Sequence, residues 1–106
     1  MANTYVNAKL DLTANSVTTL YTAVGLTTGI VKSILVSEDS GNADTITVTV
    51  TNGSSVFSLF KTKAIGANAT VELLTAPLVL QPTEILKVTA ATANRLHVVA
   101  SILEIT

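Results

Sequence analysis

The chain has 106 residues, of which 48% are hydrophobic and 12% are charged, and its formal net charge is −1. This length predicts one domain with its own core, and the six scattered cations with only four aromatic residues argue against nucleic-acid binding. Without cysteine, the chain can form neither a disulfide framework nor a thiolate metal site.

The first residues, MANTYVNAKLDL, lack the basic and apolar regions of a secretory signal. No apolar run approaches the ~20 residues that a membrane span needs. We therefore expect a soluble protein without a membrane partner.

Valine, isoleucine and threonine supply 13, 7 and 18 residues, and these β-branched types favour strands. Turn signals recur at roughly ten-residue spacing, as in a sandwich of short antiparallel strands. The strands predicted in chain order are Thr4–Leu10, Ser16–Thr22, Ile30–Ser37, Asp44–Thr51, Ser55–Lys63, Thr70–Ala76, Glu84–Ala90 and Arg95–Glu104. The predicted fold is all-β: a single antiparallel β-sandwich of about eight strands, jelly-roll or Greek-key like. It would occupy residues 13–106, after an extended N-terminal arm at residues 1–12.

The clearest local pattern is the run TITVTVTNGSSVFSLF from Thr45 to Phe60. Threonines alternate with aliphatic residues up to Thr51, so the two kinds of side chain point to opposite faces of a strand. Asn52 and Gly53 then favour a turn. The run predicts a β-hairpin with an apolar inner face and a threonine-rich face toward solvent.

The last predicted strand, Arg95–Glu104, is apolar on both faces. One face carries Leu96, Val98, Ala100 and Ile102, and the other carries His97, Val99, Ser101 and Leu103. A strand buried on one face alternates more cleanly, so this strand is expected to contact a second sheet or a neighbouring subunit. Before it, Pro77 and Pro82 bracket a short apolar piece that suits an edge segment or a crossing loop.

Two segments could carry chemistry. The loop Glu38–Asp44 gathers oxygen ligands around a glycine, but it does not match a calcium-binding loop, so a solvated turn is favoured. His97 is the single histidine and would be the base of any serine or threonine nucleophile. It lies in an apolar strand and no nucleophile elbow accompanies it, so a packed or interface imidazole is favoured. We predict no catalytic residue, no cofactor and no metal site.

Several stretches together resemble small virion structural proteins of tailed bacteriophages. They are the GIVKSILV strand, the alternating strand Asp44–Val50, the ATVELL strand after a Gly/Asn turn, the LVLQPTEILKV crossing and the closing SILEI. The resemblance extends from about Val17 to Thr106. In this chain Gln81-Pro82-Thr83-Glu84 stands where related proteins often have a glycine-acid turn.

The resemblance implies a non-enzymatic protein of the virion, made in the host cytoplasm. The favoured role is a capsid decoration or cement protein that binds junctions of the major capsid protein, with a homotrimer as the favoured assembly. A tail, neck or fibre-attachment component is the first alternative, and a carbohydrate-binding sandwich is the second. The N-terminal arm is a candidate for strand addition to a neighbour. The residues expected at a partner interface are Tyr5, Val6, Leu10, His97, Val99 and Leu103.

Overall fold

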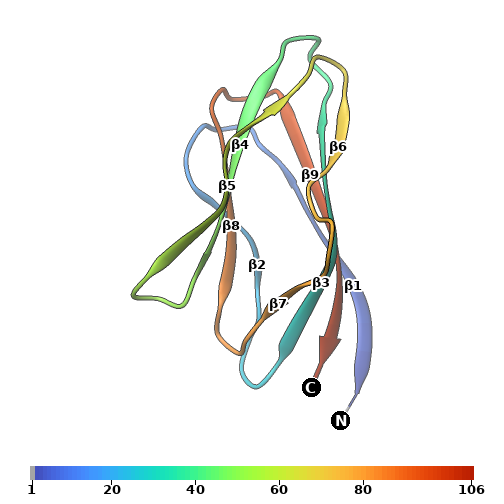
Figure 1. The fold of residues 1–106 in the computed structure, drawn as a ribbon, viewed down its shortest axis with the longest axis vertical. Coiled ribbons are helices and arrows are strands. Elements are labelled where there is room, and N and C mark those ends of the chain that lie inside the picture. Colours follow the sequence, from blue (N-terminus) through green and yellow to red (C-terminus); the bar gives the residue numbers. More distant parts are fainter. Residues whose placement is uncertain (1) are drawn as a thin grey trace.

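The computed structural model describes residues 2–106, which form two antiparallel sheets packed face to face (Figure 1). Sheet A contains, in spatial order, β1 (Asn3–Asp11), β9 (Leu96–Ile105), β3 (Thr28–Glu38) and, along the outer edge of β3, both β6 (Thr70–Glu72) and β7 (Leu78–Leu80). Sheet B contains β2 (Thr18–Thr22), β8 (Ile85–Ala90), β4 (Asp44–Thr51) and β5 (Val56–Ile65). The predicted all-β sandwich is confirmed. No helix occurs between residues 2 and 106, and hence none that could cross a membrane.

The strand pairing is that of one long hairpin rolled up on itself. β1 pairs with β9, β2 with β8, β3 with β6 and β7, and β4 with β5, so the β4–β5 connection is the tip of the hairpin. Rolling then places β9 beside β3 and β8 beside β4. This is the strand order of a jelly roll. The short strands β6 and β7 share the place of one strand, which is why nine strands form where the sequence predicts eight.

The segment between Pro77 and Pro82 is the second half of that divided strand. Residues 78–80 pair with β3 at an edge of sheet A, as the sequence allows. The first half is shorter than predicted, because β6 ends at Glu72. The Glu72 carboxylate then accepts a hydrogen bond from the backbone N–H of Ile34 at 2.8 Å, at the part of β3 that neither short strand covers. One side chain thus completes the interrupted edge.

The core lies between the inner faces of the two sheets. In β4, Ile46 and Val48 are fully buried and Val50 nearly so, which confirms the alternation predicted for this strand. The threonines of its other face are half-buried to buried rather than exposed, because β4 lies between β8 and β5. Asn52 and Gly53 form the hairpin turn, with Gly53 at a φ of 98°.

The N-terminal segment, for which an extended arm is expected, lies in sheet A in the single chain. Residues 3–11 are extended, but they pair with β9 over their whole length and form an edge strand of sheet A. The inward-facing Val6, Ala8 and Leu10 pack against the core. Met1 lies outside the described residues. In the single chain, burial of this apolar face holds the strand on the sandwich.

A buried polar contact joins the two sheets near their open end. The Tyr21 hydroxyl of β2 donates a hydrogen bond to Oε2 of Glu104 on β9 at 2.6 Å. Burial, followed by the hydrogen bond to Glu104 and its negative charge, raises the pKa of Tyr21. The folded state therefore favours the neutral phenol.

This raised pKa predicts a loss of stability in alkali. A group whose pKa is raised on folding contributes its full stabilisation below its unfolded pKa, here about 10, and loses it as the pH rises through the folded value. The difference in urea midpoint between the wild type and Tyr21→Phe should be constant up to about pH 10 and shrink above it. Glu104→Gln should make that loss smaller and complete it at a lower pH, since the amide carries no charge and the folded pKa of Tyr21 is then raised less. Identical pH profiles for the wild type and Tyr21→Phe would contradict the assignment.

Candidate partner interface

The outer face of sheet A carries an uncovered row of apolar side chains. Tyr5, Leu103, Ile30 and Val79 are register partners across β1, β9, β3 and β7, so their side chains lie side by side on one face. Tyr5 is 76% exposed and Val79 is 49% exposed. Leu103 and Ile30 are half-buried yet do not belong to the set that packs against the core. The row therefore presents an apolar surface away from the chain's own interior.

A second row lies further along the same face. Val99 of β9 pairs with Leu35 of β3, and these side chains are 38% and 41% exposed. Lys9 and Glu72 occupy the two ends of this row. Between the two rows, Asn7, Ser101 and Ser33 are register partners and form a polar strip. The surface thus combines apolar anchors with small polar groups.

Four of the six residues predicted at a partner interface share this face: Tyr5, His97, Val99 and Leu103. The other two do not join them. Val6 and Leu10 lie on the opposite face of β1, half-buried against the core. Strand alternation could have separated them, because Tyr5 and Val6 are adjacent and must point to opposite faces.

The sequence-based set also missed three apolar residues of this face: Ile30, Leu35 and Val79. Ile30 has an even residue number and Leu35 an odd one, so regular alternation along β3 would place their side chains on opposite faces. A register shift between Val31 and Ser33 in the β3–β9 pairing inserts one residue and brings both to the outer face. No local sequence signal marks that bulge.

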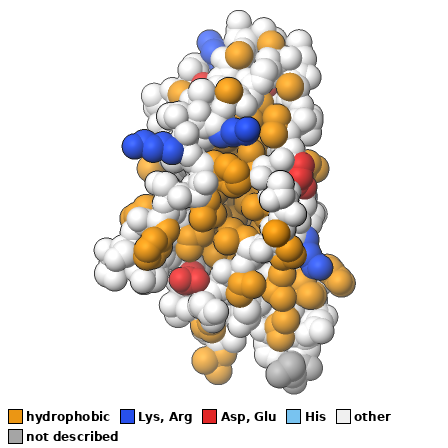
Figure 2. All heavy atoms as spheres, in the orientation of Figure 1, with side chains coloured by type: hydrophobic (Ala, Val, Ile, Leu, Met, Phe, Trp, Pro, Cys, Tyr) orange, Lys and Arg blue, Asp and Glu red, His pale blue; other side chains and the backbone are white. Residues whose placement is uncertain are grey.

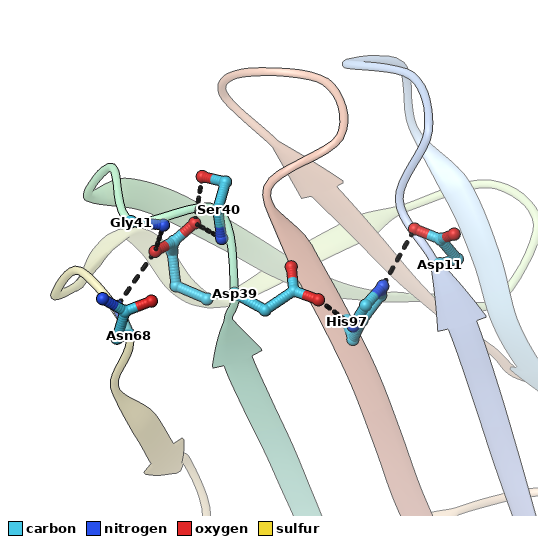
Figure 3. Close-up of polar contacts among 7 residues, drawn as sticks. Asp11, Asp39, Ser40, Gly41, Asn68 and His97 are labelled. Carbon is cyan, nitrogen blue, oxygen red and sulfur yellow. Dashed lines mark hydrogen bonds and ion pairs between the residues drawn. The ribbon is translucent and has the colours of Figure 1, made fainter.

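The end of this face is polar and is organised around His97 (Figure 3). Nε2 of His97 lies 3.2 Å from Oδ1 of Asp11 on β1, and Nδ1 lies 3.3 Å from Oδ2 of Asp39 after β3. A neutral imidazole has one N–H and can donate to one carboxylate, whereas the protonated ring can donate to both. No hydrogen bond joins His97 to a serine or threonine hydroxyl within residues 2–106, so the geometry of a nucleophilic triad is not formed there.

The loop Glu38–Asp44, which was considered as a cation site, is instead held in place by Glu38, which is 2% exposed. Its carboxylate accepts hydrogen bonds from the backbone N–H groups of Ser40, Gly41 and Asn68 at 2.7, 3.0 and 3.0 Å, and from the Ser40 hydroxyl (Figure 3). Burial alone would raise the pKa of Glu38, but these hydrogen bonds outweigh it and lower the pKa to about 2. The carboxylate oxygens that a cation would need already accept hydrogen bonds from the protein.

A second apolar surface lies where the two sheets are open to each other, between β5 and the segment joining β6 to β7. It is a groove of about 350 Å³, lined mainly by Leu59, Phe60, Leu73, Leu74, Pro77 and Leu78. Figure 2 shows apolar side chains running down the middle of this side of the molecule. The tip of the β4–β5 hairpin projects beyond the body (Figure 1), with Val56 and Phe57 67% and 55% exposed.

Within the described part of the chain, no three His, Cys, Asp or Glu side chains gather as a metal site. The aromatic side chains do not form a stacking platform either. Tyr5 lies on the outer face of sheet A, Phe57 lies on β5 of sheet B, and Tyr21 and Phe60 pack against the core.

No family model matches this chain, and no curated protein matches it. Its backbone is similar to two solved structures, each described as a pentameric capsid protein isolated from metagenomic phage sequences. Both are 18% identical to this chain over 93% of its length, with TM-scores of 0.48 and 0.47. The chain spans 58% and 60% of the length of these two chains.

Proposed function

We propose that this chain is a non-catalytic structural protein of a tailed-phage particle, with capsid decoration as the favoured role. The observation that carries the proposal is the uncovered apolar face of sheet A. Its strand β9 buries Leu96, Val98, Ala100 and Ile102 on one side and presents Val99 and Leu103 on the other, next to Ile30 and Leu35. Apolar rows of this kind on a chain with few charges are typical of a surface that a protein partner covers.

Two further considerations support the same role. The jelly roll occurs in viral capsid proteins, although it also occurs in lectins and enzymes, so the fold alone does not determine the function. The sequence resemblance to small virion proteins of tailed phages favours the viral use of the fold. The scarcity of charge means that attachment would rest on apolar contacts and backbone pairing rather than on ion pairs.

In the decoration role, the partner is the major capsid protein, and the resemblance favours three copies around a capsid-protein junction. In the alternative role, the same face binds a tail, neck or fibre component. The two roles use the same chemistry, so they are distinguished by the particle that the protein binds.

The test is a binding assay with two purified particles from the phage that encodes this chain: empty capsids of its major capsid protein, and tail tubes. Wild-type protein should co-sediment with the capsids and should not co-sediment with the tail tubes. Val99→Glu should lose most of that binding, since it places a charged carboxylate in an apolar contact. Its circular dichroism should stay unchanged, because Val99 does not pack against the core.

Leu26→Glu is the matched control, because Leu26 is 90% exposed in the turn before β3 and lies outside sheet A. It should bind like the wild type. Binding to tails alone would favour the alternative role, and binding to neither particle would count against a virion role. If Val99→Glu binds as well as the wild type, the outer face of sheet A is not the contact surface.

The carbohydrate-binding alternative requires aromatic side chains that converge on one site. Here the exposed aromatic rings, Tyr5 and Phe57, belong to different sheets. No described feature therefore favours a sugar site over a protein contact.

A further inference from the structure

The four outer edges of the two sheets are protected unequally. β6 and β7 have three residues each, β2 has five residues with a register shift, and β5 has two register shifts along its pairing with β4. Short or bulged edge strands of this kind resist pairing with another chain. β1 is the exception, since its nine residues pair with β9 without any shift.

The outer edge of β1 is open to a partner strand. Apart from its pairing with β9, no backbone hydrogen bond involves residues 3–10 within the described chain. Figure 1 shows β1 at the outside of sheet A, with no further strand beyond it. β1 contains no proline, and Lys9 is its only cation. A regular, unprotected edge of this length is a template for strand addition.

We infer that β1 pairs antiparallel with β1 of a second copy of this chain, about a two-fold axis at Asn7. This register is the one in which all nine residues of β1 find a partner, because residues 3–11 are centred on Asn7. The two sheets A then become one continuous sheet across the dimer. The inference rests on the edges of the sandwich and is independent of the proposed role in a virion.

The side chains of this register are self-complementary. On the outer face, Lys9 lies opposite Tyr5 of the second copy, where the lysine stem and ammonium can cover the aromatic ring. Asp11 lies opposite Asn3, and the two Asn7 amides face each other, so no like charges are opposed. On the inner face, Val6 lies opposite Ala8. A shift of the two-fold axis by two residues, from Asn7 to Lys9, would place Lys9 opposite Lys9, which is unfavourable.

The partner of β1 is a second copy rather than an unrelated segment because this complementarity comes from one strand meeting itself. An isologous contact of this kind closes on two copies. It does not by itself build the three-copy assembly that the resemblance favours. The mass of the free protein in solution therefore distinguishes a two-copy from a three-copy assembly.

The test uses the full chain and two opposite charges at the two-fold axis. By sedimentation equilibrium, the wild type should associate reversibly to twice the chain mass of 11.0 kDa. Asn7→Lys and Asn7→Glu should each be monomeric, because they oppose like charges across the axis. An equimolar mixture of the two variants should recover the dimer. Asn7 is exposed and its side chain makes no hydrogen bond to any residue between 2 and 106, so both variants should fold.

Thr19→Lys is the matched control, because Thr19 is an exposed position on β2, one of the two edge strands of sheet B. It should remain dimeric. A second experiment tests the register of the two β1 strands. Asn7→Cys introduces the only thiol of the chain, and two copies should form a disulfide across the axis on mild oxidation, whereas two copies of Thr19→Cys should not. A monomeric or trimeric wild type, or a charge pair that fails to recover the dimer, would overturn the inference.

Discussion

Replacing Glu38 with glutamine should lower the midpoint of thermal unfolding by roughly 10 °C at neutral pH, the largest effect that we expect from a single polar change. The Glu38 carboxylate receives three backbone N–H groups and one hydroxyl, and its side chain is 2% exposed. A glutamine has one acceptor oxygen in place of two, and its own NH₂ group would face an N–H donor. The loop after β3 and the turn at Asn68 would both lose their anchor.

The same contact predicts how this effect depends on pH. The pKa of Glu38 is lowered on folding, so its stabilisation is present above the unfolded value, about 4.5, and is lost as the pH falls through the folded value of about 2. The difference between wild type and Glu38→Gln should be constant above about pH 4.5 and should shrink toward pH 2, as measured by urea midpoints.

Glu84→Gln is the control for Glu38→Gln. Glu84 is half-buried, and its carboxylate accepts one backbone N–H, that of Gln81, at 2.7 Å. It should lose much less stability at neutral pH. An equal loss of stability in the two variants would show that the additional hydrogen-bond donors around Glu38 do not add to its contribution.

The second large effect is expected at Gly29, where β3 passes beneath the ring of Tyr21. A Cβ atom at this position would lie 2.8 Å from Cε2 and 3.2 Å from the hydroxyl oxygen of Tyr21. The ring cannot move freely, because it packs against the core and its hydroxyl is bonded to Glu104. Gly29→Ala should therefore destabilise the fold by about 1–3 kcal/mol, as overpacking does.

A double-mutant cycle separates this clash from other effects of the substitution. In a Tyr21→Ala background, Gly29→Ala should be neutral or stabilising, because alanine loses less backbone entropy than glycine in a strand. Gly66→Ala is the matched control, since a Cβ there would meet its nearest neighbour, Ala69, at an ordinary 3.7 Å. If Gly29→Ala still destabilises the fold strongly in the Tyr21→Ala background, this explanation is wrong.

Local patterns predicted most of the sandwich. The alternation of β4, the turn at Asn52 and Gly53 and the two-faced β9 are properties of neighbouring residues, and each has the predicted place in the structure. The pairing of β1 with β9 and the bulge after Val31 depend on residues far apart in the sequence. Spacing alone contains no information on either of them.

For the same reason, the sequence predicted only part of the arrangement of the candidate site. The two faces of β9 could be separated by counting, and this placed His97, Val99 and Leu103 together. The role of Glu38 could not be found in this way, because one of its donors, Asn68, lies 30 residues further along the chain. Its acidic neighbours resembled a cation loop, whereas its actual partners are amide groups.

The position of β9 in sheet A also affects how the chain can fold during synthesis. β9 is the strand that bridges β1 and β3, yet it is translated after all the others. Sheet B can close once β8 has left the ribosome, but β1 has no native partner, and β3 lacks a partner along one of its two edges, until residues 96–105 emerge. Such distant pairing is slow to form. We therefore expect the nascent chain to expose β1 and one edge of β3 until β9 has been synthesised, and to be most prone to aggregate during that interval.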